Sequence, residues 1–192
     1  MAQSDAAMGG APVLAFASAG AFEDWLDAHD TACAGVWLKL AKKSSGIVSM
    51  TDDEAVDVGL CFGWISGQRR ALDAQYYLQK YVPRRPRSLW SQVNVKKAEC
   101  LSASGRVRAR GLAEIAAARA DGRWAAAYAA QRDAVVPSDM RAALAKSSRA
   151  RRAFEALGKS QRYAMIHRVI TARTERARNA RMQRVMRELG RR

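Results

Sequence analysis

The stretch that decides the fold lies in the first half of the chain and reads TDDEAVDVGLCFGWISGQRRALDAQYYLQKYVP (residues 51–83). It opens on a capping box, in which the Thr51 side chain can accept from the amide of Glu54 while the Glu54 carboxylate reaches back. Three acids in this first turn also suit the positive end of a helix dipole. We therefore expect a helix that ends at Gly63 and buries its apolar positions, Ala55, Val58, Leu60 and Phe62.

Two runs rich in aromatic and β-branched residues follow this helix and predict a β-hairpin. They span residues 64–72 and 75–82, and the Asp-Ala pair between them supplies the turn. Residues 71–79 would also tolerate a helix. Pro83 and Pro86 end the second strand, because proline cannot donate to a sheet ladder, and they predict a loop.

The residues before the capping box predict a further helix and strand. Ser18 can cap a short helix whose apolar residues share one face, namely Phe22, Trp25 and Leu26. In residues 36–42 apolar side chains alternate with side chains expected on a more solvent-exposed face, which is typical of a strand. Residues 1–14 hold alanine, glycine and small polar residues without periodicity, so we expect a disordered tail.

From Asn94, a candidate helix cap, the apolar spacing is helical. Helices are expected at residues 95–103, 111–120, 124–131, 139–146 and 149–157, and again from residue 160. The resulting fold class is α+β, with a small antiparallel sheet and flanking helices in the N-terminal half and an all-helical C-terminal half. The predicted parts are a tail (1–14), an α+β domain (15–110) and a helical region (111–192) that ends in a basic amphipathic helix.

The charge is concentrated in that last helix. The chain carries 33 Lys and Arg against 18 Asp and Glu, and residues 151–192 hold 13 of these bases but 3 of the acids. Its apolar stripe comprises Met182, Val185, Met186 and Leu189. The opposite side collects five arginines, Arg173, Arg176, Arg184, Arg187 and Arg191. This side is either a solvated face in an Arg-rich composition or a polyanion-binding face, for instance for nucleic acid.

Several function classes find no support. No run approaches 18 apolar residues, so no membrane span is expected. Residues 1–17 lack the basic start of a secretory signal, so we expect a cytoplasmic location. Three cysteines without a CxxC pair predict small structural thiols. The two histidines lie far apart, and no phosphate-loop, HExxH or GxSxG motif is present, so we expect neither catalytic residues, nor a metal, nor a cofactor.

A second candidate site lies between residues 61 and 94, where arginines and hydroxyls alternate with aromatic residues. Such a set can seat an anion or stack a base. The candidate ligand-binding residues are Trp64, Arg69, Arg84, Arg85, Arg87, Ser88, Trp90 and Asn94. The alternative is that the tryptophans belong to the core and the arginines to a solvated loop.

Several short motifs resemble the YdeI/OmpD-associated family, also called the bacteriocin-protection family. They are GVWLK (35–39), LCFGWI (60–65), YLQ (77–79), PRR (83–85), SLWS (88–91) and DGRW (121–124), with the basic stretch after residue 171. The resemblance covers roughly residues 14–190, and the chain departs from it at Ser66, where an Asp is usual. It implies a role in antimicrobial-peptide or envelope-stress tolerance and no agreed catalytic residues.

Three functions are therefore carried forward. The leading one is a non-enzymatic cytoplasmic binding protein of this family that uses an Arg-rich anion-binding face. The alternative is a nucleic-acid-binding protein that uses the basic C-terminal helix. The least favoured is an enzyme that acts on a phosphorylated or acidic small molecule near residues 64–90. Neither the partner nor the oligomeric state follows from the sequence.

Overall fold

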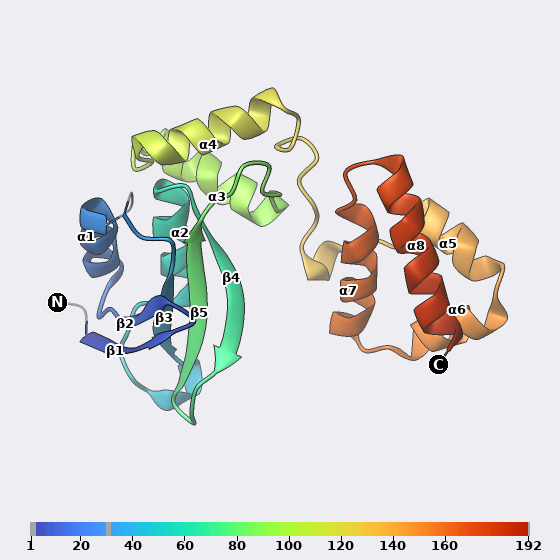
Figure 1. Ribbon diagram of the computed structural model, residues 1–192, viewed down its shortest axis with the longest axis horizontal. Helices are drawn as coiled ribbons and strands as arrows, with labels where there is room; N and C mark the ends of the chain where they lie inside the picture. Colours follow the sequence, from blue (N-terminus) through green and yellow to red (C-terminus); the bar gives the residue numbers. More distant parts are fainter. Residues whose placement is uncertain (1–2, 30–31, 192) are drawn as a thin grey trace. The chain divides into compact units, whose positions relative to one another are not determined.

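The computed structural model describes residues 3–29 and 32–191 and divides into two compact units (Figure 1). We call the first the sheet unit; it comprises residues 1–88 and 94–125. We call the second the helical unit; it comprises residues 89–93 and 126–192. The α+β fold class is confirmed.

The sheet has five strands in the order β1-β2-β3-β5-β4. The strands are β1 (Gln3–Met8), β2 (Ala11–Ala15), β3 (Val36–Ala41), β4 (Trp64–Ala71) and β5 (Tyr76–Pro83). β4 and β5 form the predicted hairpin, and β3 pairs antiparallel with β5. The expected purely antiparallel sheet is wrong in one pairing, because β2 lies parallel to β3.

The prediction of a disordered tail at residues 1–14 is wrong over the part of it that the structure describes. β1 and β2 form a hairpin that turns at Gly9 and Gly10, both in the left-handed region (φ +57° and +77°). Val13 is buried with Trp37 and Leu78, which lie far along the chain. The hairpin therefore gains its apolar contacts from distant residues, which a local pattern of small residues does not reveal.

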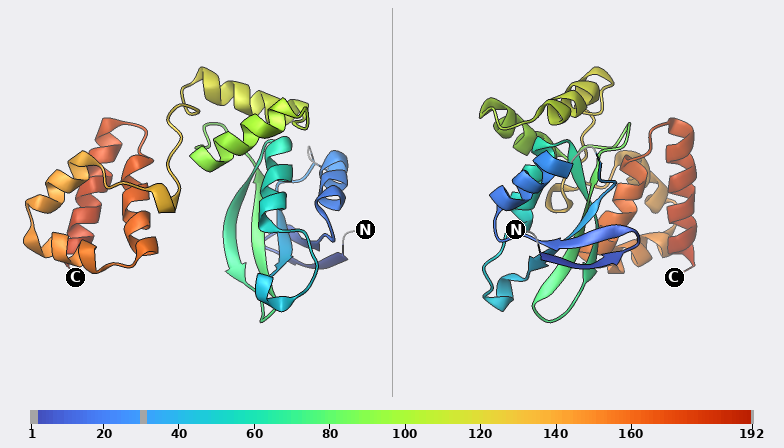
Figure 2. Two further views of the ribbon diagram at one scale, coloured as in Figure 1. Left: turned by 180° about the vertical axis from the view of Figure 1, so that it is seen from behind. Right: turned by 60° about the vertical axis from the view of Figure 1, so that its left-hand side comes forward.

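The helices of the sheet unit follow the local signals closely. They are α1 (Ala19–His29), α2 (Asp52–Cys61), α3 (Gln92–Ala103, in this unit from residue 94) and α4 (Ala109–Ala120), with a 3-10 turn η1 (Lys43–Ser45). The capping box is confirmed: the Glu54 amide donates to Thr51 Oγ1 (3.2 Å), and the Thr51 amide donates to Glu54 Oε2 (2.8 Å). α2 packs against the sheet and α1 against α2, as Figure 2 shows.

α4 belongs to the sheet unit, so the boundary predicted after residue 110 lies too early. Gly111 sits against the end of α2, where a Cβ atom would come within 2.9 Å of the Leu60 carbonyl oxygen. The Arg108 amide also donates to the Cys61 carbonyl (2.9 Å). Because only glycine allows this close approach, α4 packs onto α2, and the unit extends to residue 125.

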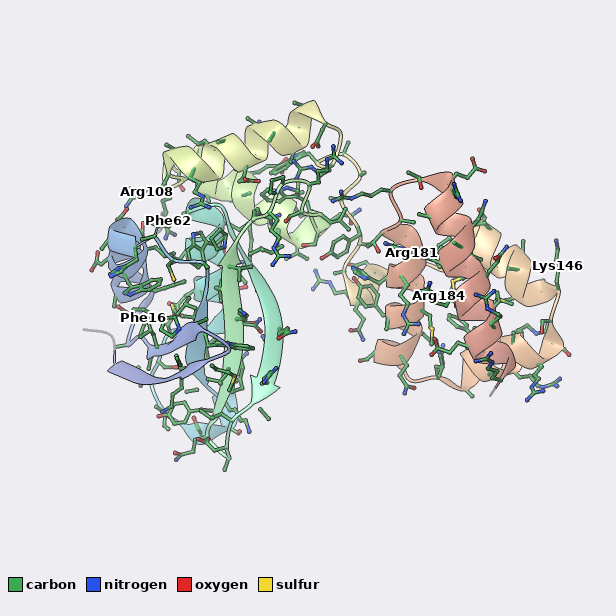
Figure 3. The ribbon with its side chains drawn as sticks, in the orientation of Figure 1. Phe16, Phe62, Arg108, Lys146, Arg181 and Arg184 are labelled. Atoms are coloured by element: carbon green, nitrogen blue, oxygen red, sulfur yellow. The ribbon has the colours of Figure 1, made fainter. Side chains whose placement is uncertain are left out.

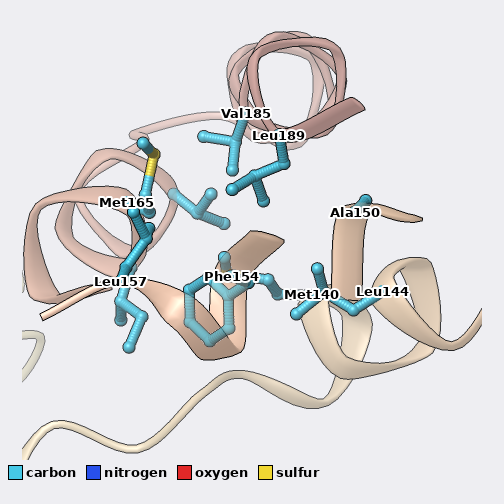
Figure 4. Packing of buried hydrophobic residues seen from close by; sticks show 10 residues of the cluster. Met140, Leu144, Ala150, Phe154, Leu157, Met165, Val185 and Leu189 are labelled. Atoms are coloured by element: carbon cyan, nitrogen blue, oxygen red, sulfur yellow. The ribbon is translucent and has the colours of Figure 1, made fainter. Parts of the chain in front are cut away.

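The helical unit contains four α-helices and a 3-10 turn among its described residues. They are η2 (Gln131–Asp133), α5 (Ser138–Ala145), α6 (Ser148–Ala156), α7 (Lys159–Ile170) and α8 (Glu175–Gly190). Their shared core includes Phe154, Val185 and Leu189 (Figure 4), and Met182 and Met186 pack against it. The predicted apolar stripe of the last helix is therefore confirmed.

Residues 124–131 do not form the predicted helix. The Tyr128 amide donates to the Trp90 carbonyl (3.1 Å), and the Gln92 amide donates to the Tyr128 carbonyl (2.9 Å), which makes a single parallel bridge. These backbone groups are therefore taken by a distant segment, which overrides the helix propensity of an alanine-rich stretch. Within residues 3–29 and 32–191, no strand follows β5.

Candidate polyanion-binding face

The two tryptophans of the candidate site between residues 61 and 94 belong to the core. Trp64 is fully buried at the start of β4 and meets Trp25 edge to face, with ring centroids 6.5 Å apart. Trp90 is only 2% exposed and belongs to the helical unit. The two rings therefore lie in different units, and neither offers a face to solvent for a ligand.

Arg69 is part of the sheet's own architecture. β4 bulges between Ser66 and Arg69, and the buried Gln79 side chain donates to the carbonyls of Gly67 (3.0 Å) and Gln68 (3.2 Å). Arg69 Nε donates to Gln79 Oε1 (2.8 Å). Its Nη2 donates to a carboxylate oxygen in the first turn of α2, at 2.6 Å. The guanidinium thus ties the bulge to α2.

The other residues of this candidate set do not converge. Arg84 is only 4% exposed, whereas Arg85 and Arg87 are exposed. Ser88 accepts a hydrogen bond at its carbonyl from an arginine of the same unit (2.8 Å). Asn94 is half-buried inside α3, which begins two residues earlier, so its predicted role as a cap is wrong. A shared ligand site for this set finds no support in the structure.

Further basic side chains of the sheet unit are held by nearby acids. Lys97 Nζ contacts Asp53 (2.9 Å) and Asp57 (2.7 Å), which joins α3 to the acidic face of α2. Arg108 reaches Glu23 (3.3 Å) and Asp27 (3.2 Å) on α1. The pKa of Lys97 is raised by its hydrogen bonds to these carboxylates, against the opposing effect of burial. The charges of this unit therefore connect its helices.

The helical unit has far fewer acids than bases. Residues 126–192 hold 17 Lys and Arg against 5 Asp and Glu, so 12 of the chain's 15 net positive charges lie here. We call the predicted set the arginine face: Arg173, Arg176, Arg184, Arg187 and Arg191. All five are exposed. Arg173 lies in the turn before α8, not on the helix as predicted.

Four of these arginines lie on α8 itself, and three of them border one shallow hollow. Arg184, Arg187 and Arg191 line it together with Glu188. Glu188 forms an ion pair with Arg168 of α7 (2.7 Å). No hydrogen bond or ion pair within the described chain uses the side chains of Arg176, Arg184, Arg187 or Arg191. Their donors therefore face solvent.

A second hollow, of about 210 Å³, lies between α7 and α8 beside this face. Arg181 and Arg184 line it (Figure 3), together with His167. Arg181 Nη1 donates to the Arg168 carbonyl (3.0 Å) and to Thr171 Oγ1 (3.1 Å), which fixes the guanidinium in place. Burial, and then the charge of Arg181, lower the pKa of His167 below its ordinary value. The hollow is therefore cationic, and its surroundings favour the neutral form of the imidazole.

One arginine of α8 points inward and has a different role. Arg178 donates to both carboxylate oxygens of Asp139 on α5, at 2.6 Å from Nε and 2.9 Å from Nη2. This bidentate pair holds α8 against α5 and lowers the pKa of Asp139. Sequence reasoning did not single out Arg178. Its position on the helix, away from the arginine face, is the signal that separates the two roles.

Other kinds of site find no support in the described part of the chain. Within residues 3–29 and 32–191, no group of three or more His, Cys, Asp or Glu side chains could hold a metal ion. None of the described helices is long and apolar enough to cross a bilayer. The arginine face and its neighbouring hollow are therefore the candidate site.

Comparisons with known proteins divide the chain in a similar way. A family model described as Domain of unknown function (DUF8412) matches residues 14–114, and one described as Bacteriocin-protection, YdeI or OmpD-Associated matches residues 133–192. No curated protein and no solved structure matches the chain. The early motifs that resemble the bacteriocin-protection family thus fall within the first match. The C-terminal part of the chain thus matches the YdeI/OmpD-associated model, and the chain belongs to the DUF8412 family, whose model covers more than half of it.

Proposed function

We propose that this protein is a non-enzymatic, cytoplasmic polyanion-binding protein whose helical unit binds nucleic acid through the arginine face. The observation that carries the proposal is the set of four exposed α8 arginines that no acid of the described chain neutralises. Arg184, Arg187 and Arg191 succeed one another by three and four residues, which is about 4.5 and 6 Å along a helix. Successive guanidinium groups can therefore follow a row of phosphates.

The charge also bears on the protective role that the family description suggests. A unit with a net charge of +12 repels a cationic peptide, so direct capture of such a peptide by this surface is disfavoured. Protection would instead act through an anionic partner inside the cell. Nucleic acid is the polyanion that this face suits best, because arginine forks match phosphate oxygens.

An enzymatic function near Trp64 and Arg84 is the less favoured alternative. Both side chains are buried, and Arg69 of the same candidate site is bound to Asp52 and Gln79. A reacting group needs an accessible surface and a free donor or base, and these side chains offer neither. We therefore place binding ahead of catalysis.

A salt series tests the proposal. Each phosphate that a base neutralises releases counterions, so log K should fall with log salt by about 0.9 per contact on duplex DNA. The five arginines of the face predict a slope of about −4 to −5 for the wild type. Fluorescence anisotropy of a labelled 20-base-pair duplex would measure it, alongside a variant that carries Gln at all five positions.

The five-fold variant should keep the wild-type circular dichroism and melting temperature, since the replaced side chains are exposed. It should lose most of both the affinity and the slope. Absence of wild-type binding to any nucleic-acid probe even at low salt, or a folded variant that binds the duplex with an unchanged slope, would overturn the proposal.

A further inference from the structure

One hollow of the helical unit has an apolar floor and a basic rim. It lies between η2, α6 and α7 and measures about 560 Å³, within the size range of small-molecule sites. Phe154 and Ile166 form its floor, and the half-buried ring of Tyr163 forms a wall. Arg132, Lys159 and Arg162 line it as well. Such a site suits a ligand with an apolar body and a negative charge.

The basic residues of this rim have little acidic compensation. Arg162 donates to the backbone carbonyls of Leu157 (2.8 Å) and Glu155 (3.0 Å), so its position is fixed without a carboxylate partner. Arg132 pairs with the adjacent Asp133 (3.2 Å), but both side chains are largely exposed, which makes the pair weak. Lys159 is exposed. The rim therefore attracts an anion.

This hollow adjoins the cationic hollow between α7 and α8. Tyr163 lines the first and His167 the second, one helical turn apart, and their ring centroids lie 5.6 Å apart. Tyr128 meets His167 edge to face at 4.8 Å. The contact between the Tyr163 and His167 rings thus links the linings of the two hollows, one of which has Lys159 at its rim and the other Arg181 and Arg184.

We infer that the hollow at Tyr163 is a nucleobase site and that the helical unit prefers single-stranded nucleic acid over duplex. This inference rests on the proposed function. An unpaired base lies in the apolar hollow against the Tyr163 ring, with the strand's phosphates on Arg181 and Arg184 at one end and on Lys159 at the other. Basic grooves lined with aromatic rings bind single strands in this way.

Two features favour a single strand. A base within a duplex is stacked and paired, and entering the hollow would require it to be flipped out at a cost in free energy. The Tyr163 ring is also held in place, because its hydroxyl donates to the Ala129 carbonyl (3.1 Å). Stacking on one such ring changes affinity by about 5- to 150-fold.

The test compares two probes and two substitutions at the same position in the full chain. The probes are a labelled 12-nucleotide oligothymidylate and a labelled 20-base-pair duplex. Tyr163→Leu removes the aromatic face, whereas Tyr163→Phe keeps it and removes only the hydroxyl. We expect the wild type to bind the single strand more tightly than the duplex. Tyr163→Leu should lose about 5- to 150-fold in single-strand affinity while its duplex affinity stays unchanged. Tyr163→Phe should keep most of the single-strand affinity, because the ring that stacks on the base remains, with folding checked by circular dichroism.

The outcomes separate the inference from the proposed function. If the wild type binds neither probe, both the inference and the proposed function are overturned. Equal or tighter binding of the duplex overturns only the preference for single strands, and so does a folded Tyr163→Leu variant with wild-type single-strand affinity. A Tyr163→Leu variant whose affinity falls equally for both probes would show that Tyr163 has a structural role, which also overturns the inference. If Tyr163→Leu does not fold, Lys159→Gln decides: it should weaken binding of the single strand more than binding of the duplex, and an equal effect on both would overturn the inference.

Discussion

The sheet unit and the helical unit use the same residue type, arginine, in opposite ways. In the sheet unit 16 Lys and Arg face 13 Asp and Glu, and basic side chains such as Arg69, Arg108 and Lys97 bind acids on neighbouring elements. In the helical unit 17 bases face 5 acids, and the four arginines of the arginine face that lie on α8 are left to solvent. The local supply of acids, more than the density of arginine, decides whether a basic side chain stabilises the fold or is available to a ligand.

Within the helical unit the same contrast recurs on one helix. Arg178 is held by Asp139 and joins α8 to α5, whereas Arg184 has no acid partner in the described chain. The two differ in which side of the helix they occupy. A candidate binding surface is therefore defined by the face that lacks acids across from it.

Thiol labelling gives the largest effect that we expect, and it reports on the sheet unit alone, because all three cysteines lie there. Cys61 is buried at the end of α2, and burial raises the pKa of its thiol, so it reacts only when the unit opens. Cys100 is exposed. We expect Ellman's reagent to label Cys100 at least about a thousand-fold faster than Cys61, given a typical stability of 5 kcal/mol or more. Rapid labelling of Cys61 in the folded protein would show that its thiol is accessible and reactive, which would contradict a purely structural role.

Truncation of Trp64 tests the claim that the tryptophans of the candidate site between residues 61 and 94 belong to the core. Trp64→Ala should lower the free energy of unfolding by roughly 3–5 kcal/mol, because the ring is fully buried. Leu112→Ala on α4 is the matched control, since that side chain is half exposed, and it should change stability by about 0.5 kcal/mol or less. Denaturant unfolding of both variants gives the two values. A stable Trp64→Ala variant would contradict its assignment to the core.

Arg178 and Arg184 test the contrast on α8. Arg178→Gln should cost about 1 kcal/mol, the upper end for a partly exposed ion pair, and Arg184→Gln close to none. The pKa of Asp139 is lowered by Arg178, so the pair stabilises the fold above the ordinary pKa of 3.8 and this contribution is lost as the pH falls through the lowered value. Thermal unfolding between pH 7 and pH 2 should therefore show less acid sensitivity in Arg178→Gln. Equal effects of the two substitutions on stability would contradict the different roles assigned to Arg178 and Arg184.

The smallest effect concerns His167, beside Tyr163 and Arg181. Its pKa should lie below 6.5, because burial and the Arg181 charge disfavour the imidazolium. The unfolded chain then binds more protons than the folded one between the two pKa values, so stability is full above pH 6.5 and falls as the pH drops through the folded pKa. A nuclear magnetic resonance titration measures this pKa, and Arg181→Gln should raise it. An unchanged pKa in that variant would show that the charge of Arg181 does not act on His167.

The sequence was sufficient where the signal was local. The capping box at Thr51, the β4–β5 hairpin and the apolar stripe of α8 depend on neighbouring residues, and each was predicted. The β1–β2 hairpin and the bridge at Tyr128 were missed, because their partners, Trp37 and Trp90, lie far along the chain.

The candidate site follows the same rule. The arginine face was predicted from helical spacing, which requires one helix only. The burial of Arg84, the ion pair at Arg178 and the aromatic wall at Tyr163 depend on tertiary contacts, so residue type alone did not reveal them. Tyr163 is half-buried at the edge of the hollow.

The most direct test removes equal charge from each unit. One variant carries Arg184→Gln, Arg187→Gln and Arg191→Gln on the helical unit, and the other carries Lys43→Gln, Arg85→Gln and Lys96→Gln on the sheet unit. All six side chains are exposed, and each variant lowers the formal net charge from +15 to +12. Binding of the labelled duplex across a salt series should lose about 2.7 of its log–log slope in the first variant and keep the wild-type slope in the second. Equal losses in both would show that net charge alone governs binding, and would contradict a dedicated arginine face.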